Sequence, residues 1–182
     1  SFKGGGVVIS DVAYGKSGQT DLSSFAVINA DVIDNVLKAT AVHELFHLFQ
    51  DNYEGPGLFQ YYEDKDAWWM EATAQWAEHY AYPKMNSEQS HLNAFIENPQ
   101  ITLTKYNHDH EYGAYIFPFY LVQVYGEKII KDIFDGSLAA GSAINSIQKE
   151  ILTYKGVFDE FWLWNYNQVP AKKYIDAGGF TK

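Results

Sequence analysis

The chain has 182 residues, of which 47% are apolar and 17% aromatic, enough for the core of one folded domain. Its net charge is −10 and its 13 basic residues include no Arg, which argues against nucleic acid and against an anionic membrane surface as partners. Cysteine is absent, so disulfides and thiol chemistry are excluded, and no apolar run is long enough to predict a transmembrane helix.

The first 52 residues predict a small β-sheet followed by a long helix. Short apolar runs at 7–9 and 25–28 predict strands on either side of a turn-rich stretch at 15–19. From about Asp31, apolar residues recur at helical spacing as far as about Asn52, with Asp31 or Asp34 as the N-cap. The stretch 54–57 contains Gly55, Pro56 and Gly57 and ends this helix.

The rest of the chain predicts mainly helices. They span residues 66–81, 88–97, 112–125, 127–134, 142–154 and 159–167, with a short β-like piece at 101–103 and irregular structure from Gln168. Asp64 or Asp66 is the expected cap of the first, and Pro118 is expected to bend the third. We therefore expect an α+β, mostly helical protein that forms a single domain, 1–182, with lobes at roughly 1–52 and 53–182.

The predicted helix at 31–52 carries the sequence His43-Glu44-Leu45-Phe46-His47. Residues four apart lie on the same face of a helix, so the two imidazoles can bind one metal ion together. Glu44 flanks that position and can take a proton from a metal-activated water. This pattern predicts a zinc site with His43 and His47 as ligands and Glu44 as general base.

A catalytic zinc requires a third protein ligand, and Glu71 is the predicted one. It is the only carboxylate between Ala67 and Ala77, a stretch rich in apolar and small residues that suits close helix packing. A carboxylate on the buried side of a helix is costly unless it is paired, and a divalent cation would pair it. The tryptophans of this helix, in contrast, are expected in the core, and His79 and His91 are expected at the surface or half-buried.

These two helices resemble those of the gluzincins, zinc metallopeptidases with two His from one helix and a Glu from a second. The stretch 69–74 is similar to the glutamate helix of thermolysin-like enzymes and related aminopeptidases. The Tyr-Gly-Ala sequence at 112–114 is similar to a later helix in secreted prokaryotic domains of this type, and the resemblance covers roughly residues 36–165. It implies a zincin-like fold and secretion. The thermolysin pattern has an acidic residue where this chain has Gln75, so Asp51 and Glu78 are the candidate outer partners of a zinc histidine.

In gluzincins a later Tyr or His donates a hydrogen bond to the oxyanion of the transition state. Aligning this chain by its Gly favours His110, whereas aligning it by the later Tyr-Leu pair and Gly favours Glu111 or Tyr112. Tyr112 is the preferred donor, with His110 as the alternative.

The expected function is zinc-dependent hydrolysis of peptide bonds in a peptide or protein substrate, held extended along the edge of the N-terminal sheet. An endopeptidase is favoured because no Arg is available to bind a C-terminal carboxylate. Ser1 stands where an initiator Met would be, so we expect a processed product or part of a longer protein with a propeptide or neighbouring domain. Two alternatives stay open: an inactive zinc-binding or interaction domain of a larger secreted protein, and a helical scaffold without metal.

Overall fold

The computed structural model describes residues 6–14, 20–29, 31, 33–54, 65–151, 154–166 and 174–175. Its elements are β1 (Gly6–Tyr14), β2 (Thr20–Ile28), α1 (Asp34–Glu54), α2 (Ala67–Ala81), the 3-10 helix η3 (Ser87–His91), α3 (Leu92–Ile96), α4 (His110–Gly113), α5 (Ile116–Tyr125), α6 (Lys128–Ala140), α7 (Ala143–Glu150) and α8 (Tyr154–Asn165). Helices dominate and the described strands form one two-stranded sheet, which confirms the α+β, mostly helical class.

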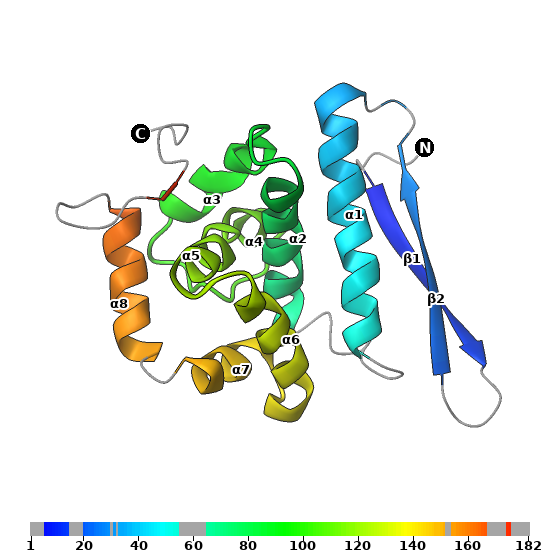
Figure 1. The fold of residues 1–182 in the computed structure, drawn as a ribbon. Coiled ribbons are helices and arrows are strands. Elements are labelled where there is room, and N and C mark those ends of the chain that lie inside the picture. The colour runs from blue at the N-terminus through cyan, green and yellow to red at the C-terminus, as the bar shows by residue number, and fades with distance from the viewer. Residues whose placement is uncertain are drawn as a thin grey trace.

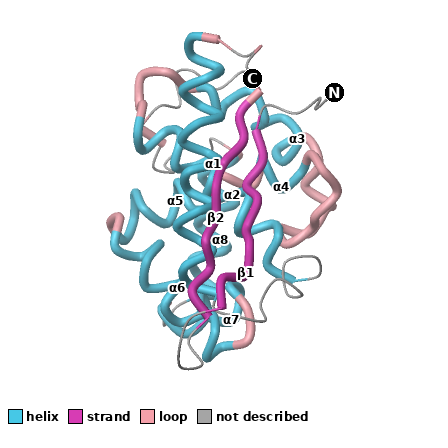
Figure 2. Tube along the Cα trace, turned by 90° about the vertical axis from the view of Figure 1, so that its right-hand side faces the viewer, coloured by secondary structure: helices cyan, strands magenta, loops and turns pink. Residues whose placement is uncertain are grey.

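The sheet is an antiparallel hairpin whose register runs from Gly6 opposite Ile28 to Tyr14 opposite Thr20. Both strands are longer than the apolar runs at 7–9 and 25–28 predicted. The extension passes through polar residues such as Ser10 and Ser24, which pair through their backbones and give no apolar signal. The hairpin lies in front of α1 when the molecule is viewed from that side (Figure 2), and both of its strands contact this helix.

Helix α1 lies between the hairpin and the helical body (Figure 1). It contacts α2 on the side away from the strands. The helix begins at Asp34, later than the predicted start near Asp31, because the backbone of Asp34 has a left-handed φ of 52° that interrupts helical geometry. The break predicted after this helix, and the capping role considered for Asp64, lie outside the described residues.

Helix α2 is buried along most of its length and supplies a large part of the core. Trp68 and Trp69 are each only 1% exposed, so the tryptophans of this helix belong to the core as predicted. Their rings lie close to Phe117 of α5 and Phe134 of α6. Asp66 occupies the N-cap position of α2, but its carboxylate caps nothing there; it accepts the backbone N–H of Ala143 at the start of α7 instead.

The single helix predicted at 112–125 is two helices, α4 and α5, separated at Ala114 and Tyr115. Pro118 lacks the N–H that would bond to the carbonyl of Ala114 four residues earlier, and its ring would clash with that carbonyl. The Ala114 carbonyl accepts a bond from Phe117 instead, which tightens the turn. The proline therefore breaks the helix before itself, where a bend had been predicted.

Other boundaries differ from the predictions in smaller ways. The helix predicted at 88–97 is formed by η3 and α3, the β-like piece at 101–103 forms turns and no strand, and the last three helices occupy the bounds given above for α6, α7 and α8. Helix α7 has a side-chain cap, since Ser142 Oγ accepts the backbone N–H of Asn145. Within the part of the chain that the structure describes, no helix has the length and apolarity needed to cross a membrane.

Gly113 allows α4 to pack directly on η3 and α3. A Cβ at this position would lie 2.5 Å from the carbonyl oxygen of His91 and 2.9 Å from the backbone nitrogen of Phe95. Such distances are shorter than real contacts, so any larger residue would push α4 away. This close approach holds Tyr112, the neighbour of Gly113, beside the part of α1 that carries the two histidines.

Candidate metal centre

The packing of α1 against α2 brings His43, His47 and Glu71 together. Their potential ligand atoms all lie within 4.8 Å of one another. Oε2 of Glu71 is 3.1 Å from Nε2 of His43 and 3.6 Å from Nε2 of His47, and the centroids of the two imidazole rings are 4.8 Å apart. Two imidazoles and one carboxylate are the donor set of many catalytic zinc sites, so the residues present fit such an ion.

The outer nitrogen of His43 faces a carboxylate. Nδ1 of His43 is 3.3 Å from Oε1 of Glu78, and the hydroxyl of Ser87 donates to the other carboxylate oxygen at 2.6 Å. Glu78 is one of the two outer partners that the sequence suggested; the side chain of the other, Asp51, lies outside the described residues. The contact with Glu78 orients the ring so that Nε2 of His43 faces Glu71 and the metal position, while Nδ1 faces Glu78.

The outer nitrogen of His47 faces an amide, which the sequence reasoning missed. Nδ1 of His47 is 2.6 Å from Oε1 of Gln50, a residue only 1% exposed. Gln50 follows His47 by three residues and so lies on the same face of α1, a signal that was available. The thermolysin pattern has an acidic residue in this role, so the resemblance points to Asp51 and Glu78 and not to an amide. Gln75 is also buried, but it is hydrogen-bonded to neither histidine.

The protein without metal holds a proton at this centre. Burial by itself would lower the pKa of His43, but its contacts with Glu71 and Glu78 outweigh burial and raise that pKa from 6.5 to about 9. Burial acts to raise the pKa of Glu71, yet the hydrogen bonds with His43 and His47 outweigh it and lower that pKa to about 2. At neutral pH the metal-free centre is therefore a protonated His43 between two carboxylates.

We expect zinc binding to release this proton. A metal ion needs neutral His43, whose pKa of about 9 leaves it protonated at pH 7. Because Glu71 is ionised throughout, the apparent zinc affinity should rise about tenfold per pH unit and level off near pH 9. Calorimetry in buffers of different ionisation enthalpy should count about one proton released per zinc at pH 7.

A matched control for this titration is Glu78→Gln. Removing the carboxylate beside Nδ1 takes away one cause of the raised pKa of His43, so the plateau of zinc affinity should move to lower pH. A wild-type affinity that did not change between pH 6.5 and 8.5 would contradict this description of the centre.

Glu44 follows His43 on α1, and its side chain lies against Gly6, the first residue of β1. Its side chain is buried, and burial is the main cause that raises the pKa of its carboxyl; the charge of Glu71 acts in the same direction and the two histidines oppose it. A Cβ built on Gly6 would lie 2.5 Å from Cγ of Glu44. Glycine at the start of β1 therefore lets the strand lie directly against this carboxylate, which accounts for its shielding from water.

The structure places the two candidate oxyanion donors differently. The ring centroid of Tyr112 is 6.1 Å from that of His43. Burial, and then the negative charge of Glu71, raise the pKa of the Tyr112 hydroxyl, so this group stays protonated and able to donate. The ring of His110 instead packs against Phe95 at 4.9 Å, and its Nδ1 is 3.3 Å from the carbonyl oxygen of Ala94.

His91 is half-buried, as predicted, but it also borders the centre, which was not expected. Its ring centroid lies 5.4 Å from that of Tyr112. Burial is the main cause that lowers its pKa; His43 acts in the same direction, while Glu78 and Asp109 oppose it. The neutral ring of His91 thus supports Tyr112. No sequence signal reveals this neighbour, because the contact depends on the close approach of α4 to η3.

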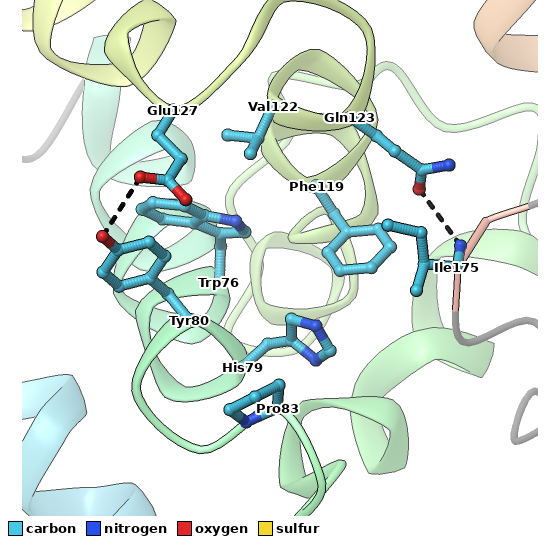
Figure 3. Close-up of a pocket in the computed structure, with 9 residues that line it drawn as sticks. All are labelled: Trp76, His79, Tyr80, Pro83, Phe119, Val122, Gln123, Glu127 and Ile175. Atoms are coloured by element: carbon cyan, nitrogen blue, oxygen red, sulfur yellow. Dashed lines mark hydrogen bonds between the residues drawn. The ribbon is translucent and has the colours of Figure 1, made fainter.

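A separate pocket of about 270 Å³ lies between α2 and α5 (Figure 3). None of the residues of the centre lines it, and its walls are mainly apolar and aromatic, with Trp76 and Phe119 among them. Its polar groups are paired with protein atoms. The hydroxyl of Tyr80 donates to Glu127 at 3.2 Å, and the N–H of Ile175 donates to Gln123 at 3.2 Å. We therefore assign this pocket no ligand.

Comparison with known proteins gives a family without a known activity. No curated protein and no solved structure matches the chain. One family model matches residues 9–167, a span that includes both helices of the candidate metal centre and Tyr112. Because that span is most of the chain, the protein belongs to the family of unknown function DUF6055.

Proposed function

We propose that this protein is a zinc-dependent peptidase with a zincin-like fold, in which His43, His47 and Glu71 hold the metal. The observation that carries the proposal is the convergence of these three ligand atoms within 4.8 Å, on two packed helices, beside a buried Glu44. The outer contacts of both histidines add support, since catalytic zinc ligands in proteins are commonly oriented in this way. An isolated ion pair between helices would not need one carboxylate shared by two imidazoles, with a separate outer partner for each ring.

The chemistry divides among a few residues. Zinc, when bound, would supply a Lewis acid that activates water and polarises a carbonyl group. Glu44 would take the proton of the attacking water and return it to the leaving amine, a role that suits a carboxyl whose pKa is raised by burial. Tyr112 would donate its hydroxyl proton in a hydrogen bond to the oxygen of the attacked carbonyl.

A peptide could reach this centre along the hairpin. The first residue of β1, Gly6, lies against the side chain of Glu44. Among the described strands, β1 and β2 pair only with each other, so each strand has one unpaired edge. An extended peptide can add to such an edge through its backbone, with its scissile bond carried past Glu44. This mode favours an endopeptidase, in agreement with the absence of an Arg that could bind a C-terminal carboxylate.

We expect Tyr112→Phe to lower kcat/KM about 100- to 1,000-fold, the usual loss when one oxyanion donor is removed. Zinc affinity should not change, because the hydroxyl is not a ligand. The comparison variant is His110→Gln, which alters a buried ring on the far side of the same short helix. If His110→Gln folded, kept its zinc and lost more activity than Tyr112→Phe, the assignment of the donor would be reversed.

The proposed function is tested on the purified chain by metal analysis and by cleavage of casein and quenched fluorescent peptides. One zinc per chain, cleavage abolished by a chelator and cleavage restored by zinc are the expected results. One zinc per chain without hydrolysis of any peptide pool would replace the proposal with that of an inactive zinc-binding domain. Failure to bind zinc at all would leave a helical scaffold whose buried ion pairs serve stability alone.

A further inference from the structure

We propose that Gln50 is a positioning residue for the metal centre: it fixes His47 in the tautomer that presents Nε2 to the metal and locks α1 to α2 at that point. The proposal rests on the proposed function for the metal, but its central claim concerns the protein's own hydrogen bonds. The network comprises His47, Gln50, Met70 and Thr73, and Gln50 joins it together by bonding to His47 on α1 and to Met70 and Thr73 on α2.

The orientation of the Gln50 amide follows from its partners on α2. Its nitrogen lies 3.0 Å from the backbone oxygen of Met70 and 2.9 Å from Oγ1 of Thr73. A backbone carbonyl can only accept, so the group that faces Met70 must be the amide NH₂. The Thr73 hydroxyl donates to the carbonyl of Trp69 at 2.7 Å and thus also accepts from Gln50. The amide oxygen must therefore be the atom that faces His47.

The tautomer of His47 follows from the orientation of that amide. An amide oxygen can only accept, and it lies 2.6 Å from Nδ1 of His47. Nδ1 must then carry a hydrogen, and the neutral ring keeps its lone pair on Nε2, the atom that faces Glu71. The backbone of α2 thus determines, through Gln50, which ring nitrogen of His47 on α1 is available to a metal.

The two histidines are held by different chemistry. The outer partner of His43 is the carboxylate of Glu78, whereas the outer partner of His47 is an uncharged amide. A carboxylate at position 50 would add a buried negative charge to a centre that already contains Glu44, Glu71 and Glu78. An amide provides the orientation without that charge, which gives a reason for Gln at position 50.

The test uses Gln50→Leu, which removes the acceptor, and Gln50→Glu, which keeps an acceptor for Nδ1 but loses the donors to α2. We expect Gln50→Leu to weaken zinc binding about 10- to 100-fold, as the loss of an outer partner commonly does. Gln50→Glu should recover most of this loss. The control is Gln75→Leu, a buried glutamine replaced in the same way on α2, which should leave zinc affinity unchanged.

A second readout does not depend on metal or on activity. Nitrogen NMR of the metal-free protein reports which ring nitrogen of His47 carries the hydrogen. The wild type and Gln75→Leu should show Nδ1–H, and Gln50→Leu should lose this preference. A folded Gln50→Leu with wild-type zinc affinity and an unchanged tautomer would overturn the proposal, as would an equal loss of affinity in Gln75→Leu.

The two readouts also separate this inference from the proposed function. If the wild type binds zinc but cleaves no peptide, the peptidase proposal fails while the affinity series still decides the role of Gln50. If the wild type binds no zinc, the tautomer measurement still decides whether Gln50 sets the state of His47. Should Gln50→Leu not fold, Gln50→Glu takes its place: a ring that loses Nδ1–H in that variant contradicts the proposal.

Discussion

Replacing Glu44 with Gln should reduce peptide hydrolysis by about 100- to 10,000-fold, the contribution typical of a general base. The amide has nearly the same size as the carboxylate, so the close contact with Gly6 should be preserved and the hairpin should stay in place. The amide cannot accept the proton of the attacking water. Hydrolysis of a quenched fluorescent peptide, measured beside zinc content, is the check.

Zinc content separates a lost base from a lost metal. Glu44 is not among the three grouped ligand residues, so Glu44→Gln should keep one zinc per chain. Glu97→Gln, an exposed carboxylate on the helical body, serves as the control for a simple change of charge and should retain full activity. A Glu44→Gln protein that cleaved peptides at the wild-type rate would falsify the proposed role of this residue.

The second large effect is expected from Glu71→Gln, which removes the carboxylate that lies between the two imidazoles. Loss of an outer partner costs about 10- to 100-fold in metal affinity, and loss of a direct ligand should cost more. We expect zinc to be absent after ordinary purification, and hydrolysis to be absent with it. Metal analysis and titration with a competing chromophoric chelator are the measurements.

Glu78→Gln is the matched comparison, because it makes the same chemical change about two turns further along the same face of α2. It leaves the three candidate ligands in place and alters the outer contact of His43, so its loss of affinity should stay within the range for outer partners. Circular dichroism should show that both variants are folded. If Glu78→Gln lost zinc while Glu71→Gln retained it, the assignment of ligand and outer partner would have to be exchanged.

Local spacing predicted the parts of this molecule that lie on one element. His43 and His47 are four residues apart on one helix, so their shared face follows from helical geometry. The α+β, mostly helical class also followed from periodicity. Glu71 required a further argument, that a lone carboxylate in an apolar helix needs a partner. That argument holds because α2 is buried along most of its length.

The features that the sequence did not predict depend on contacts between elements. The contact of Gln50 with His47 follows from their spacing on α1, but the orientation of its amide appears only once Met70 and Thr73 of α2 are placed beside it. His91 borders Tyr112 only because Gly113 lets two short helices touch. The break at Ala114 is local, but its position depends on the carbonyl four residues before a proline, and apolar periodicity does not report this.

The division of the candidate ligands between α1 and α2 bears on the lifetime of the folded protein. His47 and Glu71 are 24 positions apart (71 − 47), so one ion would cross-link α1, which lies against the hairpin, to α2 of the helical body. Binding to the folded state alone would stabilise it by about 2.7 kcal/mol at a free zinc concentration 100 times the dissociation constant. Where zinc is scarce, the protein would lose the metal and, with it, the cross-link between the two helices. Proteolysis would then degrade the zinc-free molecules first.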